Sequence, residues 1–273
     1  MSIKESAAAF QALHEGPGIF VMPNPWDTGT ARVLAGLGFE ALATTSQGLA
    51  NSLGMLDGDV RRKVHLRHAR EIVDATPLPV NGDLENGYGH DPDTVARTIR
   101  KAAKAGLVGC SIEDASKDPD EPIYPLDLAV KRIKAAAKAA RKLPFPFVLT
   151  ARAENYLYGR VDLPDTIARL QAYEEAGADV LYAPGLRDIE EIKKVCEALS
   201  KPVNVLALKG GPSVAELGEA GVRRVSLGSN LHRVAMGALL RGAKELKEQG
   251  TLGFLDEAAT TAELEPFLSS PHS

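Results

Sequence analysis

Hydrophobic and polar positions follow two alternating patterns along the chain. Short runs of apolar and β-branched residues recur, and each is followed by a longer segment with the spacing of an amphipathic helix. The short runs predict eight strands, at residues 19–22, 41–44, 80–83, 108–112, 147–150, 180–182, 203–206 and 225–227. The segments between them predict helices at residues 60–74, 94–104, 126–142, 166–175, 189–199 and 213–219. This alternation is typical of parallel strands connected by crossover helices.

Eight such units favour one α/β domain, a (β/α)8 barrel of the TIM type. A doubly wound open sheet is the alternative, but we would expect it to carry a glycine-rich turn after the first strand. Residues 23–27, which read Pro-Asn-Pro-Trp-Asp, contain no glycine. We therefore predict a single domain over residues 1–273, with the barrel over about residues 5–240, a C-terminal helical extension at 241–268 and a frayed tail at 269–273.

The predicted extension is more apolar than a free tail requires, which favours docking on the barrel or on a neighbouring subunit. Its large apolar residues are Leu252, Phe254, Leu255, Leu264 and Phe267.

Composition narrows the class of partner. The formal charge of −4 is too balanced to favour nucleic acid or an anionic membrane, so a small-molecule site is the better hypothesis. Cys110 and Cys196 are the two cysteines, and they support neither a disulfide framework nor a cysteine-rich zinc site. We find no secretory signal and no stretch apolar enough to span a bilayer, and we expect a cytoplasmic protein.

Acidic residues gather where the predicted strands end. In a barrel the active-site groups lie at the carboxyl ends of the strands. Asp83 and Glu85 share one side of the third strand end, Glu113 ends the fourth, and Asp57 lies on the long loop after the second. Because such carboxylates repel one another, we predict that they hold Mg²⁺, or Mn²⁺ as the alternative ion, with water and substrate completing the shell. The alternative is that each acid is a solvated loop residue.

The turn after the second strand offers groups that suit an anion. Ser46, Gln47 and Gly48 supply a hydroxyl and consecutive backbone N–H groups, which can hold a carboxylate or a developing oxyanion. An ordinary turn is the alternative interpretation. No histidine is placed to serve Ser46 as a base, so a serine triad is not predicted.

Further polar and aromatic residues accompany the other strand ends. Arg152 can bind a carboxylate through two parallel hydrogen bonds or neutralise the acids. Trp26 can form an apolar wall, and Asn204 can point into the pocket or pair with the backbone. Lys209 and the glycines beside it lie where many barrels bind phosphate, although such a lysine is more often solvated than catalytic.

Together these motifs resemble the isocitrate lyase and phosphoenolpyruvate mutase superfamily, over nearly the whole chain. The segments that carry the resemblance are Trp26-Asp27 with Ala31-Arg32, Thr45-Ser46-Gln47-Gly48, Leu56-Asp57-Gly58, Asp83-Leu84-Glu85-Asn86-Gly87-Tyr88-Gly89, Ser111-Ile112-Glu113-Asp114 and Thr150-Ala151-Arg152-Ala153-Glu154.

The resemblance implies a metal-dependent barrel. In it Asp83 would bind Mg²⁺ directly, while Asp57, Glu85 and Glu113 would act directly or through water. Asp57 and Glu113, with Arg152, would also be the groups closest to the chemistry.

The resemblance also implies how a substrate lies. Ser46, Gln47 and Gly48 would hold its carboxylate, and Arg152 would face its reacting end. The last helices would swap between subunits, in dimers that pair into tetramers.

Two departures from the superfamily's motifs limit which of its activities can be expected of this chain. The superfamily usually has Asp-x-Asp where this chain has Asp83-Leu84-Glu85. The lyases carry a Lys-Lys/Arg-Cys-Gly-His gating loop soon after the fourth-strand acid, and the mutase has an asparagine there. Residues 115–124 read Ala-Ser-Lys-Asp-Pro-Asp-Glu-Pro-Ile-Tyr and contain neither signature. Decarboxylation or hydrolytic cleavage of oxaloacetate-like acids is among the remaining superfamily reactions.

Our hypothesis is a Mg²⁺-dependent lyase that cleaves a C–C bond in a small 2-oxo or 2-hydroxy carboxylic acid through an enolate. Tyr124, Glu121 or a metal-bound water are the candidate acids or bases, and the 115–124 loop closes over the site. Three alternatives remain at this stage. They are a mutase or hydrolase for phosphonopyruvate or phosphoenolpyruvate with Lys209 and Arg152 as anion contacts, a non-catalytic oxo-acid-binding relative, and a Schiff-base aldolase at Lys209.

Overall fold

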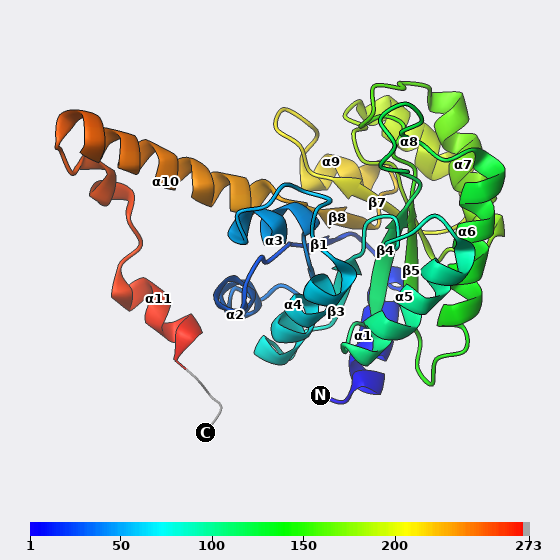
Figure 1. The fold of residues 1–273 in the computed structure, drawn as a ribbon, viewed down its shortest axis with the longest axis horizontal. Helices are drawn as coiled ribbons and strands as arrows, with labels where there is room; N and C mark the ends of the chain where they lie inside the picture. Colours follow the sequence, from blue (N-terminus) through cyan, green and yellow to red (C-terminus); the bar gives the residue numbers. More distant parts are fainter. Residues whose placement is uncertain (270–273) are drawn as a thin grey trace.

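Eight parallel strands form the wall of a barrel in this computed structural model, which describes residues 1–269 (Figure 1). Neighbours in the sheet follow the order β1-β8-β7-β6-β5-β4-β3-β2. Ala43 N donates to Pro23 O at 3.0 Å across the remaining edge, so the barrel is nearly closed. The predicted fold class is confirmed. The strands are β1 (Phe20–Met22), β2 (Leu42–Ala43), β3 (Val80–Asp83), β4 (Gly109–Glu113), β5 (Val148–Arg152), β6 (Val180–Tyr182), β7 (Val203–Leu206) and β8 (Arg224–Ser226).

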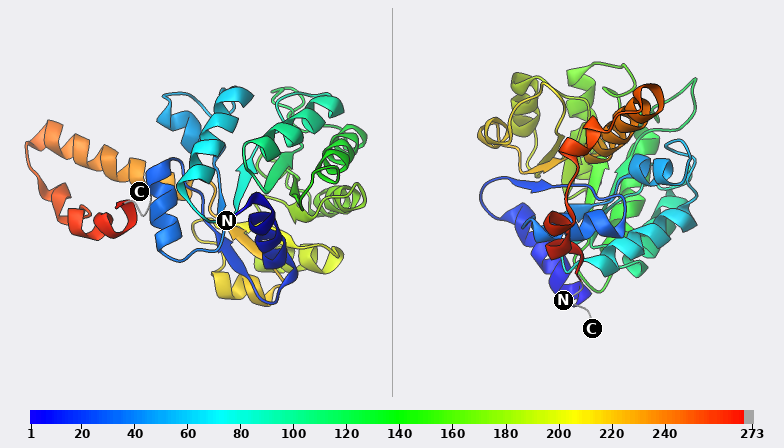
Figure 2. Two further views of the ribbon diagram at one scale, coloured as in Figure 1. Left: turned by 90° about the horizontal axis from the view of Figure 1, so that it is seen from below. Right: turned by 90° about the vertical axis from the view of Figure 1, so that its left-hand side faces the viewer.

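Helices surround the strands on the outside of the barrel, as Figures 1 and 2 show. Each of the six helices predicted between strands is present, with ends shifted by at most a few residues. Aspartate caps open several of them: the side chains of Asp91, Asp162 and Asp188 accept hydrogen bonds from the first-turn backbone amides. The helices are α2 (Thr28–Gly36), α3 (Ser46–Ser52), α4 (Arg62–Ala75), α5 (Pro92–Lys104), α6 (Leu126–Ala140), α7 (Leu163–Glu175), α8 (Ile189–Ala198) and α9 (Val214–Glu219).

Strand register brings the site residues to one rim. Asp83 of β3 pairs with Ser111 of β4, and Glu113 of β4 pairs with Arg152 of β5. Because all strands run parallel, the residues that end them lie at the same end of the barrel. The acids that the sequence places far apart therefore meet at this rim.

The amino-terminal end of the barrel is closed by α1 (Ile3–Glu15), a helix that the sequence analysis did not predict. Phe10 is fully buried and packs so close to Gly109 that a Cβ there would lie 2.8 Å from its ring. His14, also buried, lies between the Phe10 carbonyl (Nδ1 to O, 2.7 Å) and the Arg224 guanidinium (Nε2 to Nη1, 3.0 Å). Burial, followed by the Arg224 charge, lowers the pKa of His14 to about 3. His14 is therefore a neutral acceptor for Arg224 inside the barrel.

The C-terminal segment leaves the barrel as an arm, in orange and red in Figures 1 and 2. It consists of α10 (Asn230–Gln249), the short 3₁₀ helix η1 (Gly253–Glu257) and α11 (Thr261–Leu268), which packs on α2. The boundary predicted at about residue 240, between the barrel and the helical extension, falls inside α10. None of the described helices is long and apolar enough to cross a membrane. The tail predicted at 269–273 lies, from residue 270 on, outside the described residues.

Candidate active site

A cavity of about 730 Å³ opens at the carboxyl end of the barrel. Directly beneath it, Asp83 and Arg152 line a smaller polar cavity of about 40 Å³ inside the barrel. The structure therefore brings Asp83 and its neighbours from separate strands to one place. Of the predicted site residues, those lining the larger cavity are Ser46, Asp57, Glu85, Glu113 and Arg152.

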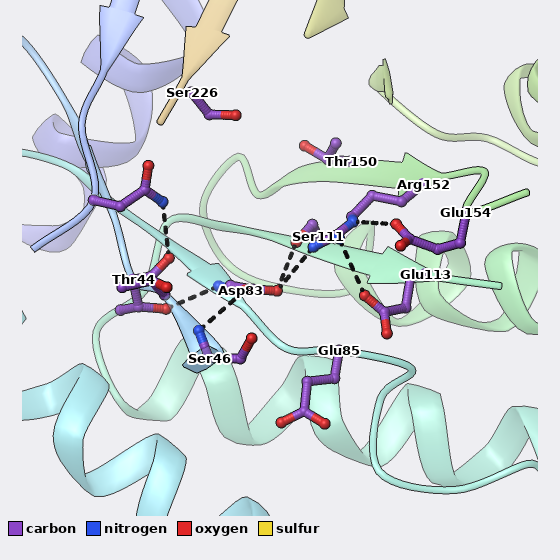
Figure 3. Close-up of polar contacts among 12 residues, drawn as sticks. Thr44, Ser46, Asp83, Glu85, Ser111, Glu113, Thr150, Arg152, Glu154 and Ser226 are labelled. Atoms are coloured by element: carbon purple, nitrogen blue, oxygen red, sulfur yellow. Dashed lines mark hydrogen bonds and ion pairs between the residues drawn. The ribbon is translucent and has the colours of Figure 1, made fainter. Parts of the chain in front are cut away.

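Arg152 is the centre of the charged cluster (Figure 3). Its Nη1 lies 3.1 Å from Asp83 Oδ1, its Nη2 lies 3.4 Å from Glu113 Oε2, and its Nε donates to Glu154 Oε1 at 2.7 Å. Burial opposes the charged form, but the three carboxylates outweigh it and hold the pKa of Arg152 well above its usual value. Arg152 is thus a fixed cation, and Glu154, which the sequence analysis noted only as part of a motif, is one of its partners.

Asp83 is held by the residues that follow β2. Its Oδ2 accepts from the backbone N–H of Ser46 at 3.1 Å, and its own N–H donates to Thr44 Oγ1 at 2.9 Å. Burial alone would raise the pKa of Asp83, but Arg152, His65 and the Ser46 hydrogen bonds together lower it. The Asp83 carboxylate is therefore ionised. Its contacts with Ser46 and Arg152, drawn in Figure 3, fix its direction.

In two other carboxyls the surroundings disfavour the charged form. Burial, and then repulsion from Glu154 and Asp83, raises the pKa of Glu113 well above its usual value despite the nearby Arg152. Partial burial, and then repulsion from Asp83, raises the pKa of Asp57. The cavity thus has more acidic side chains than its basic side chains neutralise. Such an environment attracts a positively charged ligand.

Lys117 reaches into this cavity from the loop after β4, and the sequence analysis did not single it out. Its ammonium forms an ion pair with Glu85 Oε2 and donates to Gly58 O at 3.0 Å. His65 Nδ1 lies 3.7 Å from the other Glu85 oxygen. Glu85 is buried, and its Oε1 forms no hydrogen bond with the described residues, so Lys117 is the partner of its other oxygen. The partners of Lys117 lie 32 and 59 positions away in the chain. The local sequence therefore shows a basic residue in this loop but does not indicate that it enters the cavity.

The acids are therefore arranged around the cavity and do not form a closed cage. Within residues 1–269, no three of the Asp, Glu, His and Cys side chains converge closely enough to ligate one ion. Asp83 faces Arg152, and Glu85 faces Lys117. Mg²⁺ usually keeps several waters and takes one or two protein carboxylates directly. This donor set fits such a largely hydrated ion, with the remaining acids bonding to its water.

The predicted anion-binding turn is a helix rather than a loop. Ser46 begins α3, and Thr45 caps it by accepting from Gly48 N–H at 3.2 Å. The Ser46 amide is bonded to Asp83, and Gln47 Oε1 accepts from the Ser229 hydroxyl. The cap explains why the structure has a helix where a loop was expected. A threonine before a short apolar segment opens a helix, and its side chain accepts from a first-turn amide that a loop would leave free. Ser46 is the residue of this turn that lines the cavity.

Two further predicted residues lie away from the larger cavity. Trp26 packs edge-on against His232, with ring centroids 5.3 Å apart. Asn204 is buried within the barrel, donates to Ser226 Oγ at 3.0 Å, accepts from Arg224 Nε at 2.8 Å and lines the small cavity below Asp83. Their predicted contact with substrate remains a prediction.

The candidate acids and bases differ in burial and in hydrogen bonding. Tyr124 is buried and its hydroxyl is bonded to His90 Nδ1 at 2.7 Å, whereas Glu121 is exposed on the loop. Lys209 is exposed and is not among the residues that line the large cavity. Asp114 points away from Glu113, as strand alternation requires, and accepts from Glu154 N at 2.8 Å and Tyr173 Oη at 2.6 Å, so its role is structural.

Comparison with known proteins places the chain in a family of enzymes. The family model of phosphoenolpyruvate phosphomutase matches residues 10–247. A crystal structure from Burkholderia cenocepacia, described as a candidate lyase or mutase, is 55% identical, with a TM-score of 0.95, and the match covers 98% of this chain and 97% of that one. A 2,3-dimethylmalate lyase of the PEP mutase and isocitrate lyase superfamily is 29% identical, with a TM-score of 0.84 and coverage of 96% and 94%.

Curated relatives agree with these structures. An oxaloacetate decarboxylase from Pseudomonas putida is 28% identical over 231 residues, which are 80% of this chain and 76% of that protein. The family match, the barrel and the charged rim all lead to the same assignment. The chain belongs to the phosphoenolpyruvate phosphomutase family, within the PEP mutase and isocitrate lyase superfamily, and it is an enzyme of the lyase type.

Proposed function

We propose that this enzyme cleaves a C–C bond in a small, oxaloacetate-like 2-oxo or 2-hydroxy acid through an enolate, with Mg²⁺ as its cofactor and Mn²⁺ as a substitute. The observation that carries the proposal is the Arg152 guanidinium fixed beside Asp83 and Glu113 at the floor of the cavity. The oxaloacetate decarboxylase and the dimethylmalate lyase among its relatives support this class of reaction.

Asp83 is the residue we assign to direct metal binding, with Asp57, Glu85 and Glu113 bonded to metal waters. A bound Mg²⁺ supplies Lewis-acid stabilisation for negative charge that develops on a chelating 2-oxo acid. The protein residues supply position and charge. Arg152 presents a permanent cation to the carboxylate or leaving group, and its three carboxylate partners prevent the guanidinium from turning. The Ser46 hydroxyl, beside Asp83 at the cavity wall, is available to a substrate carboxylate oxygen.

The test is a product assay with oxaloacetate and related diacids, with Mg²⁺ and after chelation. Asp83→Ala is the variant, and Asp127→Ala, at an exposed acid that pairs only with Lys131 on its own helix, is the matched control. We expect turnover by wild type and by the control, and loss of turnover on chelation or in Asp83→Ala. Undiminished turnover after chelation would refute the metal-dependent mechanism.

The family match itself favours a second candidate, a mutase or hydrolase acting on phosphonopyruvate or phosphoenolpyruvate. Arg152 would then contact the phosphorus-bearing group. Adding phosphonopyruvate to the same assay separates the two functions by product: inorganic phosphate or phosphoenolpyruvate indicates this candidate. Tight oxalate binding with no turnover of any of these acids would indicate a non-catalytic relative.

We also propose that the protein is a homo-oligomer, a dimer or a tetramer, assembled through the C-terminal arm. The arm projects from the barrel (Figure 2). Within the described chain, α10 exposes large apolar side chains. Val234, Leu239 and Leu240 expose 68%, 61% and 58% of their surface. The double substitution Leu239→Glu and Leu240→Glu should convert the oligomer into monomers, as measured by light scattering. Lys244→Glu on the same helix should leave the oligomer intact. A wild-type monomer would refute this proposal.

A further inference from the structure

We propose that the small cavity beneath Asp83 binds ordered water, and that this water positions the Asp83 carboxylate for the metal. The water site belongs to the fold and does not depend on the reaction. The positioning role rests on the proposed function, because Asp83 is the residue assigned to direct metal binding. The groups that point to the water site are Arg224 and Asn81, which have no part in the proposed reaction.

Polar side chains form most of the wall of this cavity. The interior of such a barrel is usually filled by branched apolar side chains. Here each of the strands β3 to β8 contributes at least one polar side chain to the wall. Among them, Asn81, Asn204 and Ser226 are buried. A packed apolar interior has no use for these groups, so the layer indicates a hydrated one.

Arg224 is a buried cation in this layer, and its hydrogen-bonding capacity is only partly used. Its Nε donates to Asn204 Oδ1 at 2.8 Å, and its Nη2 donates to Thr150 Oγ1 at 2.9 Å. Its Nη1 lies 3.0 Å from Nε2 of the neutral His14. A guanidinium has five N–H groups, so these three bonds leave two. Because a buried charge needs hydrogen-bond partners, a ligand in the cavity can accept from them.

Other groups of the wall also lack partners. Asn81 is buried, and its Oδ1 has no hydrogen-bond partner among the described residues. Thr44 Oγ1 accepts from the Asp83 N–H at 2.9 Å, which leaves the hydroxyl proton of Thr44 available for donation. Water both donates and accepts, and buried waters typically bond to about three such polar groups. One kind of ligand therefore suits Arg224, Thr44 and Asn81.

The size and the charges of the cavity favour water over an ion. Its volume of about 40 Å³ has room for about two or three waters, since each needs roughly 10–15 Å³. A cation there would meet two arginines, Arg152 and Arg224. An anion would meet the Asp83 carboxylate and the side-chain oxygen of Asn81. Water is neutral and can bond to groups of both kinds.

Water in this cavity would hold Asp83 from the inside of the barrel. Arg152 and the Ser46 N–H already bond to its carboxylate (Figure 3). Because Asp83 also lines the cavity, a water there can donate to the carboxylate while accepting from Arg224. The loss of hydrogen bonds that orient a metal ligand typically lowers metal affinity by about 10–100-fold. Arg224 and Asn81 are thus positioning residues that act on the metal through water and Asp83.

Crystals of the wild-type protein, at a resolution that shows ordered waters, test the water site without any metal. We expect at least one ordered water in the cavity, within hydrogen-bonding distance of both Arg224 and Asp83. A bromide soak with anomalous diffraction separates water from a halide, because bromide would replace a bound chloride. A dry cavity, or a bromide peak inside it, would overturn the proposal.

Two substitutions remove the water by different routes. Asn81→Leu makes the wall apolar, and Ala43→Val adds two methyl groups at a buried residue that also lines the cavity. We expect the affinity for Mn²⁺, measured by electron paramagnetic resonance, to fall by about 10–100-fold in both variants. Ala136→Val makes the same enlargement at a buried alanine of α6 that does not line this cavity. This control should bind Mn²⁺ as wild type does.

Wild-type affinity for Mn²⁺ in both variants, with folding verified by urea unfolding, would overturn the positioning role. If one variant fails to fold, the other decides this role, and the wild-type crystals decide the water site in every case. If wild type itself binds no Mn²⁺, the proposed function fails and the positioning role fails with it. Ordered water in the wild-type crystals would then still support the water site.

Discussion

His14 should make the stability of the barrel depend on pH in a window set by its buried contacts. Its Nε2 accepts from Arg224 and its Nδ1–H donates to Phe10 O, so the ring is bound as a neutral tautomer. The perturbation is acidification. Protonation at Nε2 would place an N–H against the guanidinium of Arg224, and the resulting repulsion destabilises the folded state.

The size of the effect follows from proton linkage. The pKa of His14 is about 3 in the folded protein, against about 6.5 for an unfolded histidine. Between these values the unfolded chain binds more protons, so the free energy of unfolding falls as pH falls. The contribution is complete above about pH 6.5, and at pH 4.5, two units lower, the loss is about 3 kcal/mol at 1.36 kcal/mol per unit.

Urea unfolding at pH 7.5 and pH 4.5 measures this loss. The variant His14→Gln keeps an acceptor for Arg224 but has no titrating group, and His90→Gln removes an exposed histidine as the control. Carboxylates contribute equally to all three proteins, so the difference between them isolates His14. We expect wild type and His90→Gln to lose about 3 kcal/mol more than His14→Gln between the two pH values. Equal losses in all three would refute the reasoning.

Two further substitutions test the cluster and its support. Arg152→Met should abolish activity. It should also lower the free energy of unfolding at pH 7 by about 3–5 kcal/mol in urea titrations, because it leaves buried carboxylates without their cation. A stability equal to that of wild type would contradict this expectation. Arg132→Met should lower the free energy of unfolding by about 3 kcal/mol. Arg132 is fully buried and donates to the carbonyls of Gly89 and His90, in the loop after β3, at 2.5 and 2.6 Å. A loss below about 1 kcal/mol would show that these bonds contribute little.

The sequence was most informative where local pattern and topology act together. All eight strands were predicted because each is a short apolar run between turn signals, and β3, β6 and β7 have the predicted bounds. Once the barrel was predicted, its rim selected Asp83, Glu113 and Arg152 without any contact information. These residues do meet, with Arg152 bonded to both acids.

What escaped prediction depends on contacts between distant segments or on weak local signals. Lys117 gains its place from Glu85 and Gly58, and nothing in residues 115–124 specifies those partners. The helix α1 was missed because its apolar run is brief, although Ser2 and Glu5 form a capping box that marks its start. The sequence predicts a turn at Ser46, whereas the structure has the start of α3 there, because the Thr45 side chain caps the helix.

If acids from separate strands hold a divalent ion beside Arg152, Mn²⁺ should bind at that place. Anomalous diffraction from crystals soaked in Mn²⁺ and oxalate locates the ion without any assay of turnover. We expect one Mn²⁺ in the cavity, directly bound to Asp83, with oxalate between the ion and Arg152 and no such peak in Asp83→Ala crystals. Mn²⁺ bound elsewhere, or an empty cavity at saturating Mn²⁺, would contradict it.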